Sequence, residues 1–207
     1  MLFSASILVA FLVIYALLHS LLASLSLKNK LRQMFGDDFD RWYRLIYNIV
    51  AGITFLPYFA IMALLPDRVL YIVPAPWRWL MLFGQMVGVG GAGLAILQTG
   101  GARFLGLTQL MGRPLPEKGA LVVQGLYCWV RHPIYFFSLL FLWLTPLMTV
   151  NLLISYTIFT LYFYLGSIHE ERRLLAEFGP AYADYQQQVP RLIPVPGRCY
   201  SPPRQST

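Results

Sequence analysis

Polar residues that could take part in chemistry gather in two segments of the C-terminal half of the chain. The first segment runs from Gly125 to Tyr135 and contains Arg131, His132 and Pro133 in succession. Proline suits the first turn of a helix, and the amides at such a helix end can receive a carboxylate. Arg131 and His132 add donors beside it, so the segment could bind an anionic group. The competing interpretation is an interfacial anchor, in which the arginine contacts lipid phosphate and the aromatic residues contact headgroups.

The second segment begins with Glu170 and Glu171 and ends near Pro190. Both carboxylates directly follow an apolar stretch, where a charged group is costly to desolvate and tends to have a partner. Glu170 could therefore hold the amino group or the ribose hydroxyls of a cofactor. The competing interpretation is a solvated helix, in which Glu170 pairs with Arg173 for a few tenths of a kcal/mol.

Several motifs of soluble cofactor and metal sites are missing from the chain. It contains no G-x-G-x-x-G after a strand, no P-loop and no H-E-x-x-H. The three histidines, His19, His132 and His169, are too scattered to predict a metal site. We expect His19, which lies inside an apolar run, to form a hydrogen bond between helices.

An apolar framework must position the two polar segments. Hydrophobic residues make up 57% of the chain and charged residues only 12%, against about 25% charged in soluble domains. A membrane span needs roughly 20 apolar residues. Five spans are therefore predicted, two of them within residues 134–166 and the others near residues 2–27, 45–65 and 77–98. We expect a turn at Asn151 between the last two spans, and the alternative is a single tilted helix.

The predicted fold class is all-α. The chain is expected to be a polytopic membrane protein with five transmembrane helices, the last two forming a helical hairpin, and a cytosolic C-terminal helix. Gly84 and Gly88, four residues apart in the third run, would let another helix approach closely. The expected divisions are three N-terminal helices, a cofactor-binding region with the hairpin and a disordered tail, at residues 1–98, 99–200 and 201–207.

Charge predicts how the chain lies in its membrane. The formal net charge is +7, and the basic residues lie between the apolar runs, which indicates anionic lipid headgroups rather than nucleic acid. Loops rich in lysine and arginine stay cytoplasmic, so the N-terminus is predicted outside and the C-terminus in the cytoplasm. Two cysteines are too few for a disulfide framework, and we expect Cys128, beside a cytosolic segment, to be reduced.

Taken together, the two polar segments resemble the C-terminal signature of the isoprenylcysteine carboxyl methyltransferase family of integral membrane enzymes. The matching positions are Gly125, Tyr127, Arg131, His132, Pro133, Tyr135, Glu170, Glu171, Leu174, Phe178, Gly179, Tyr182, Tyr185, Val189 and Pro190. Shorter stretches are similar to the bacterial branch grouped with NnrU and with methanethiol S-methyltransferase, namely residues 19–24, 43–48, 104–107 and 145–150.

The resemblance implies a methyl transfer that uses S-adenosyl-L-methionine as its cofactor. It implies cofactor contacts at Gln109, Gly119, Ala120, Leu121, Val122, Tyr127, His132, Pro133, Ile134, Tyr135 and Glu170. Arg131 and His132 are the expected catalytic residues, because either could favour the thiolate form of a thiol acceptor. Eukaryotic members carry an arginine, thought to hold the substrate carboxylate, where this chain has Gly166, so the resemblance fits a neutral or thiol acceptor better.

The expected partners are membrane lipid and either a small thiol or a lipophilic, isoprenoid methyl acceptor, in the inner membrane of a bacterium. The sequence predicts no oligomeric state. One alternative is an NADPH-dependent membrane reductase of the sterol type, which shares a similar Arg-His-Pro-x-Tyr block but usually has Asn in place of Ile134; the pair Glu170 and Glu171 argues against it. Another is a non-catalytic membrane component like NnrU.

Overall fold

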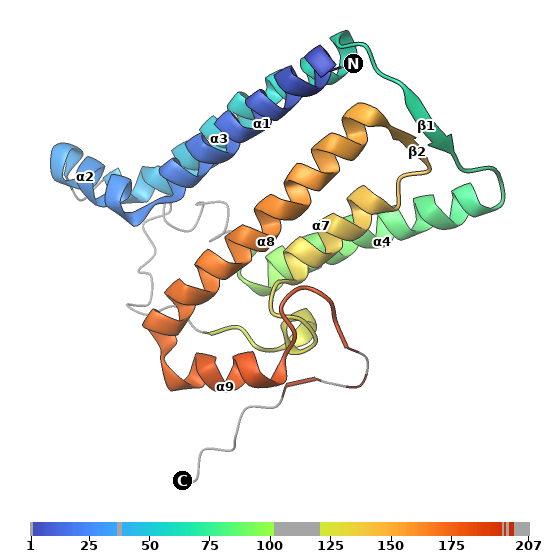
Figure 1. The fold of residues 1–207 in the computed structure, drawn as a ribbon. Helices are drawn as coiled ribbons and strands as arrows, with labels where there is room; N and C mark the ends of the chain where they lie inside the picture. Colours follow the sequence, from blue (N-terminus) through green and yellow to red (C-terminus); the bar gives the residue numbers. More distant parts are fainter. Residues whose placement is uncertain (1, 37–38, 102–120, 196, 198, 201–207) are drawn as a thin grey trace. The chain divides into compact units, whose positions relative to one another are not determined.

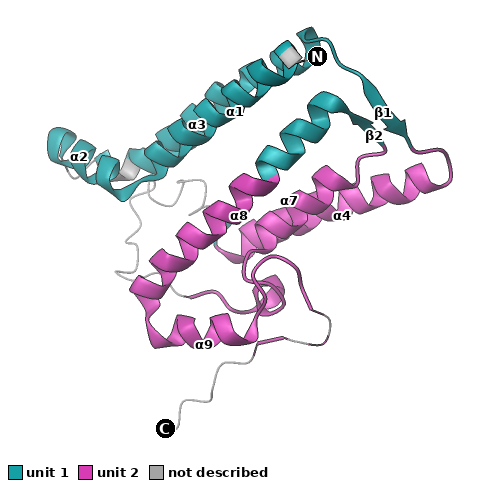
Figure 2. Ribbon diagram, viewed as in Figure 1, with its two compact units in different colours: residues 1–72, 100–117, 147–159 teal, residues 73–99, 118–146, 160–207 magenta. Residues whose placement is uncertain are grey.

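The computed structural model describes residues 2–36, 39–101, 121–195, 197, 199 and 200, and most of these residues are helical (Figure 1). The predicted tail at residues 201–207 lies outside the described residues. The chain forms two compact units (Figure 2). The first comprises Met1–Ile72, Gly100–Glu117 and Leu147–Phe159, and the second comprises Val73–Thr99, Lys118–Pro146 and Thr160–Thr207.

The first unit is built on a pair of long helices that lie side by side, α1 (Leu2–Ala23) and α3 (Phe39–Leu64), joined through the shorter α2 (Leu25–Phe35) (Figure 1). Leu8, Leu12 and Tyr58 form its buried core. The hydroxyl of Tyr47 lies 2.6 Å from Nε2 of His19. This contact joins α3 to α1 and confirms the hydrogen bond between helices that was expected for His19.

The first unit also contains a two-stranded antiparallel sheet that the all-α prediction missed. Strand β1 (Val69–Ile72) pairs with β2 (Leu147–Thr149), with a bulge between Val69 and Tyr71. The sheet forms because two short extended segments between helices satisfy each other's backbone groups. The expected turn at Asn151 was wrong, because Asn151 lies in the first turn of α8 (Val150–Phe178), where its amide donates to Asp67 Oδ1 at 3.1 Å.

The second unit rests on close packing between α4 (Trp77–Gln98) and α7 (Pro133–Trp143), which lie side by side (Figure 2). A Cβ atom at Gly88 would lie 2.9 Å from both the carbonyl oxygen of Phe137 and the amide nitrogen of Phe141. Gln85 Nε2 donates to the carbonyl oxygen of Phe141 at 2.9 Å. The glycines of α4 therefore allow the close approach that their spacing predicted.

The rest of the second unit packs around tyrosine side chains. A short 3-10 helix, η1 (Gly125–Cys128), precedes α7, and α9 (Pro180–Gln188) follows α8. Their shared core contains Cys128, Tyr182, Tyr185, Val189 and Tyr200. Cys128 is joined to Cys199 by a disulfide, so the expectation that Cys128 is reduced was wrong for this structure. A sequence offers no sign that two cysteines 71 positions apart come together when neither lies in a recognisable disulfide framework.

Among the described residues, four helices are long and apolar enough to cross a membrane. The four spans are Phe3–Ala23, Trp42–Leu64, Trp77–Gln98 and Val150–Phe178. The fifth predicted span is not confirmed, because α7 has only 11 residues and would cover roughly half of the hydrocarbon core at ~1.5 Å per residue.

The packing of α4 against α7 can be tested with a matched pair of glycines. Gly88→Ala should lower the thermal stability of the protein, because backbone atoms of α7 block the new methyl group and overpacking typically costs about 1–3 kcal/mol. Gly90 has no atom within 4 Å of the position of a Cβ, so Gly90→Ala should leave stability unchanged or raise it by up to about 1 kcal/mol. Thermal unfolding followed by circular dichroism in one detergent would compare them, and equal melting temperatures would contradict the packing.

The cysteine pair can be tested by chemical labelling. Protein trapped with a maleimide during cell lysis and then denatured should carry no label at Cys128 or Cys199, and it should gain two labels when it is reduced first. Mass spectrometry of the intact chain measures the difference. Labelling of both thiols without a reductant would show that they are unpaired in the cell.

Candidate functional site

The candidate site lies in the second unit, where α7 begins beside the second half of α8. Two backbone hydrogen bonds hold the residues before α7 against the segment after α9: Arg131 N donates to Pro190 O at 2.9 Å and His132 N donates to Arg191 O at 3.1 Å. Pro133 is the first residue of α7, as its missing N–H predicts. The two sequence segments singled out for their polar residues are thus joined directly.

Glu171 is the buried centre of this region. Only 3% of its side chain is exposed. Its Oε1 lies 3.1 Å from His132 Nε2 and 3.0 Å from Arg131 Nε. Its Oε2 accepts from Arg191 Nη2 at 2.8 Å, from Arg191 Nε at 3.1 Å and from Gln186 Nε2 at 3.2 Å. One carboxylate therefore ties together the start of α7, α8, α9 and the segment that follows α9.

Glu170, the preceding residue of α8, has a different environment. Its side chain is 37% exposed, and its Oε2 accepts a hydrogen bond from the Tyr135 hydroxyl at 3.1 Å. The same oxygen lies 3.6 Å from His132 Nδ1. Glu170 is thus oriented from one side by two neighbours while part of the carboxylate stays accessible.

Stacked rings form the wall beside Glu170. The ring of His132 stacks on Tyr135 with centroids 5.3 Å apart and an interplanar angle of 6°. Tyr135 in turn stacks on Phe163 of α8 at 5.2 Å and 9°. Because the rings hold one another in place, the imidazole and the phenol hydroxyl face Glu170 in fixed orientations.

Electrostatics favours a charged His132. Burial opposes its charged form, but hydrogen bonds and charge attraction from Glu170 and Glu171 outweigh that penalty and raise the pKa of His132 above its ordinary value. The stabilisation that His132 contributes is therefore present below the ordinary histidine range and is lost as pH rises through the raised value. At neutral pH this arrangement favours an imidazolium between two carboxylates.

Tyrosines of the core surround the same groups. Tyr127 donates its hydroxyl to Ala95 O at 3.5 Å and its carbonyl accepts from the Tyr185 hydroxyl at 2.5 Å. Burial and the charge of Glu170 raise the pKa of Tyr127 to about 12, so it remains a neutral donor. The hydroxyl of Tyr182, whose side chain is 1% exposed, has no hydrogen-bond partner among the residues that the structure describes.

The structure brings together part of the residue set expected to bind a cofactor. His132, Tyr135 and Glu170 are in mutual contact, and Pro133 and Ile134 form the first turn of α7 beside them. Tyr127 lies in η1, Leu121 packs on the tyrosine core and Val122 lies before η1 in a segment that is neither helix nor strand. The remaining three expected positions, Gln109, Gly119 and Ala120, lie outside the described residues.

Three residues of this region had not been assigned to the site: Glu171, which was expected only to have a partner, and Gln186 and Arg191. Adjacent glutamates on a helix point about 100° apart, so Glu170 and Glu171 must face different surroundings. That geometry was available from the sequence. The identity of the partners was not, because Gln186 and Arg191 come from α9 and from the segment beyond it.

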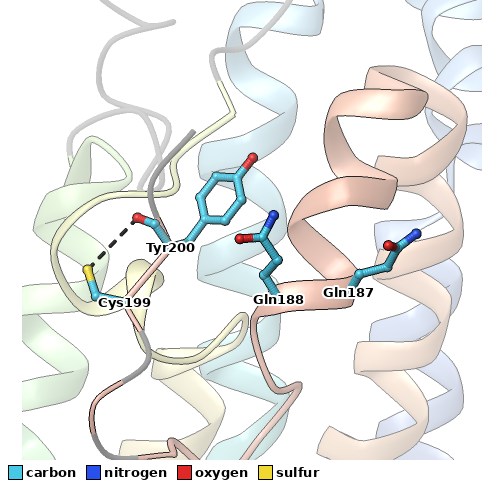
Figure 3. Close-up of a pocket in the computed structure, with 4 residues that line it drawn as sticks. All are labelled: Gln187, Gln188, Cys199 and Tyr200. Carbon is cyan, nitrogen blue, oxygen red and sulfur yellow. Dashed lines mark hydrogen bonds between the residues drawn. The ribbon is translucent and has the colours of Figure 1, made fainter. Parts of the chain in front are cut away.

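A hollow lies among Gln187 and Gln188 at the end of α9 and Cys199 and Tyr200 beyond it (Figure 3). Its volume is about 360 Å³. Tyr200 closes one side of it, with its hydroxyl donating to Asp184 Oδ2 at 2.8 Å. Both glutamines that line the hollow are exposed at the end of α9, and neither lies among the contacts of Glu170, Glu171 or His132 described above.

Comparison with known proteins identifies a family that covers most of the chain and relatives that match part of it. A family model described as protein of unknown function (DUF1295) matches residues 4–189. The chain is 33% identical over 126 residues to methanethiol S-methyltransferase of Pseudomonas sp. (strain GM41(2012)), an alignment that covers 59% of this chain and 48% of the relative. With methanethiol S-methyltransferase of Mycobacterium tuberculosis the identity is 40% over 87 residues, covering 42% and 35% of the two chains.

A relative from an animal matches as well. Protein-S-isoprenylcysteine O-methyltransferase of Tribolium castaneum is 38% identical over 126 residues, covering 56% of this chain and 42% of the relative. These matches confirm the resemblance carried by the two polar segments. The aligned part spans less than half the length of each of these three relatives. No solved structure gives a significant match.

Proposed function

The chain belongs to the DUF1295 family, and we propose that it is an integral membrane methyltransferase that takes its methyl group from S-adenosyl-L-methionine. The observation that carries the proposal is Glu170, a partly exposed carboxylate held by Tyr135 and His132 beside the first turn of α7. The names of the relatives support the same reaction class. The four long apolar helices support a site held at a membrane.

The polar groups at this place fit the cofactor's chemistry. The first amides of a helix have no partner within it and favour an anion, and the side chain of His132 does not cap α7. They suit an amino-acid carboxylate, while the accessible oxygen of Glu170 suits an ammonium group or ribose hydroxyls. The buried Tyr182 hydroxyl, without a partner among the described residues, is a further polar group that a bound molecule or water could satisfy.

The bound cofactor would supply an activated methyl group on a sulfonium. The protein's contribution would be alignment and exclusion of water: Glu170 and the start of α7 hold one partner, while the stacked rings of His132 and Tyr135 form a rigid wall. Transfer would form a bond between the methyl carbon and the acceptor and break the carbon–sulfur bond of the sulfonium, and the acceptor's proton would leave to solvent. The catalytic role predicted for Arg131 and His132 stays a prediction. In the structure both side chains contact Glu171.

A small thiol is the acceptor that we favour over a prenylated one. Two of the relatives are named for methylation of methanethiol. Gly166 lies one turn before Glu170 on α8, and a Cβ at this glycine would have only the Tyr135 hydroxyl within 4 Å, at 3.9 Å. This position therefore carries no charged group that could hold a carboxylate.

The orientation follows from the charge of the loops. We place the N-terminus outside and the C-terminus in the cytoplasm of a bacterial inner membrane, because all basic residues except Arg68 and Arg78 lie in the segments that this topology leaves inside. Termini on opposite sides need an odd number of crossings, so this topology requires a fifth crossing in addition to the four long apolar helices. The cofactor would then enter from the cytosol, and an apolar acceptor could enter from the bilayer.

Cofactor binding is tested by titration calorimetry of the purified protein with S-adenosylhomocysteine. Glu170→Gln should weaken binding about 10- to 100-fold, because a hydrogen bond to a charged group contributes about 1.5–3 kcal/mol. Glu177→Gln is the matched control, since Glu177 is exposed on the same helix, and it should bind like the unaltered protein. A folded, unaltered protein that binds no S-adenosylhomocysteine would overturn the proposal.

The acceptor is tested by headspace gas chromatography of membranes given S-adenosylmethionine and methanethiol. Dimethyl sulfide should form, and Gly166→Leu should abolish it by filling the space beside Tyr135 while S-adenosylhomocysteine still binds. Gly166→Ala, whose methyl group meets only ordinary van der Waals contact, should keep most of the activity. Methylation of a prenylated cysteine instead of methanethiol would replace the thiol assignment.

A further inference from the structure

Two adjacent carboxylates of α8 have opposite surroundings. Glu171 accepts four hydrogen bonds from three side chains, His132, Gln186 and Arg191, and is 3% exposed. Arg131 Nε adds an ion pair at 3.0 Å that is not a hydrogen bond. An ionised carboxylate offers about four lone-pair sites, so Glu171 is saturated by the protein and has no capacity left for a ligand. Glu170, at 37% exposure and with contacts to Tyr135 and His132, retains that capacity.

His132 lies between the two carboxylates. Its Nε2 faces Glu171 Oε1 at 3.1 Å and its Nδ1 faces Glu170 Oε2 at 3.6 Å. A neutral imidazole has one donor nitrogen and one acceptor nitrogen, whereas an imidazolium donates from both. The Nε2 contact is a hydrogen bond, whereas the Nδ1 contact at 3.6 Å is an ion pair, and only the charged ring is attracted to both carboxylates. The ring plane is already held by its stack on Tyr135.

We propose that Glu171 is a positioning residue that acts on Glu170 through His132: its saturated carboxylate holds the imidazole charged and in plane, so that the second ring nitrogen aims the ligand-facing carboxylate of Glu170. The proposal rests on the function proposed above, because Glu170 is the group expected to meet the cofactor. Glu171 itself touches no ligand in this arrangement.

The charges around His132 determine the pH at which its ring loses its proton. Glu170 and Glu171 of α8 favour the imidazolium. Two arginines that contact Glu171 carry the same sign of charge as the imidazolium and therefore oppose it: Arg131, next to it in the chain, and Arg191, from the segment after α9. Tyr135 of α7 contacts the ring without a charge. Arg191 opposes it in a second way, because it shares Glu171 with the histidine.

This competition gives two substitutions with opposite effects. Glu171→Gln removes a carboxylate from His132 and should lower the pH at which the ring loses its proton, by about one unit or more. Arg191→Gln removes a positive charge and frees Glu171 for the histidine, so it should move the same midpoint upward. Arg191 is 32% exposed, so this variant should also fold where a change at Glu171 is less tolerated.

The affinity for S-adenosylhomocysteine should follow that midpoint. Measured by calorimetry from pH 6 to pH 10, affinity should fall as the imidazolium is lost, at lower pH in Glu171→Gln and at higher pH in Arg191→Gln. His132→Gln should remove this step from the profile, and Glu171→Asp should restore part of it. If the contacts of Glu171 only stabilised the fold, both variants would bind more weakly, but their midpoints would not move in opposite directions.

A second readout separates this proposal from the proposed function. The carbon-bound ring protons of histidine report protonation by NMR in the ligand-free protein, and the His132→Gln variant assigns the signal among the three histidines. Opposite shifts of the His132 midpoint support the positioning role even if S-adenosylhomocysteine does not bind, which overturns the proposed function alone. Equal or unchanged midpoints in Glu171→Gln and Arg191→Gln overturn the positioning role whether or not the cofactor analogue binds.

Discussion

The candidate site of the second unit depends on one buried carboxylate. Moving an ionised carboxylate out of water costs several kcal/mol unless it is paired and hydrogen-bonded, and Glu171 is 3% exposed. Contacts from Arg131, His132, Gln186 and Arg191 offset this cost. Because these residues come from separate segments, the requirement to satisfy one charge selects the arrangement of the start of α7, the end of α8, α9 and the segment beyond.

The apolar part of the unit supports that arrangement without determining it. Tyrosine side chains of α9 pack beneath η1, and the Tyr185 hydroxyl donates to the carbonyl of Tyr127. Such packing is tolerant of small shifts, since an aromatic ring keeps much of its contact when it slides. The charged groups are not tolerant, because hydrogen bonds weaken steeply away from their preferred geometry. The precision of the site thus comes from the ionic contacts and the stacked rings.

Much of the helical framework was predictable because the length of an apolar run is enough to predict a long apolar helix. The third apolar run matches α4 at both ends, Trp77 and Gln98. The first run was predicted too long because Ser24 begins a new helix, with its side chain accepting from the amide of Leu27. The boundary at Asn151 failed because Asp67, which is distant in the sequence, accepts from that amide and lets the helix begin there. Local pattern does not contain such long-range partners.

The candidate site shows the same division. Pro133 at the first position of α7 and Glu170 at the end of an apolar stretch follow from residue type and position. The different environments of Glu170 and Glu171 could not be predicted in this way, because the two residues themselves do not indicate which side of α8 will meet α9. The strand pair was missed for a related reason: Val69 and Thr149 pair across 80 positions of sequence, and segments of three and four residues carry too little pattern to predict.

The disulfide of Cys128 indicates an oxidising compartment, whereas the charge of the loops places the same segment in the reducing cytoplasm. The geometry of the site depends on neither. Tyr200 is held by hydrogen bonds as well as by its neighbour's disulfide, its amide donating to Cys128 O at 2.9 Å and its hydroxyl to Asp184. A disulfide acts mainly by restricting the unfolded chain, whereas these hydrogen bonds act in the folded one. Neither cysteine contacts Glu171 or His132 among the interactions of the described residues. Reduction in a cytosol would therefore lower the stability of the unit while the contacts of Glu171, and with them the aim of Glu170, stay in place.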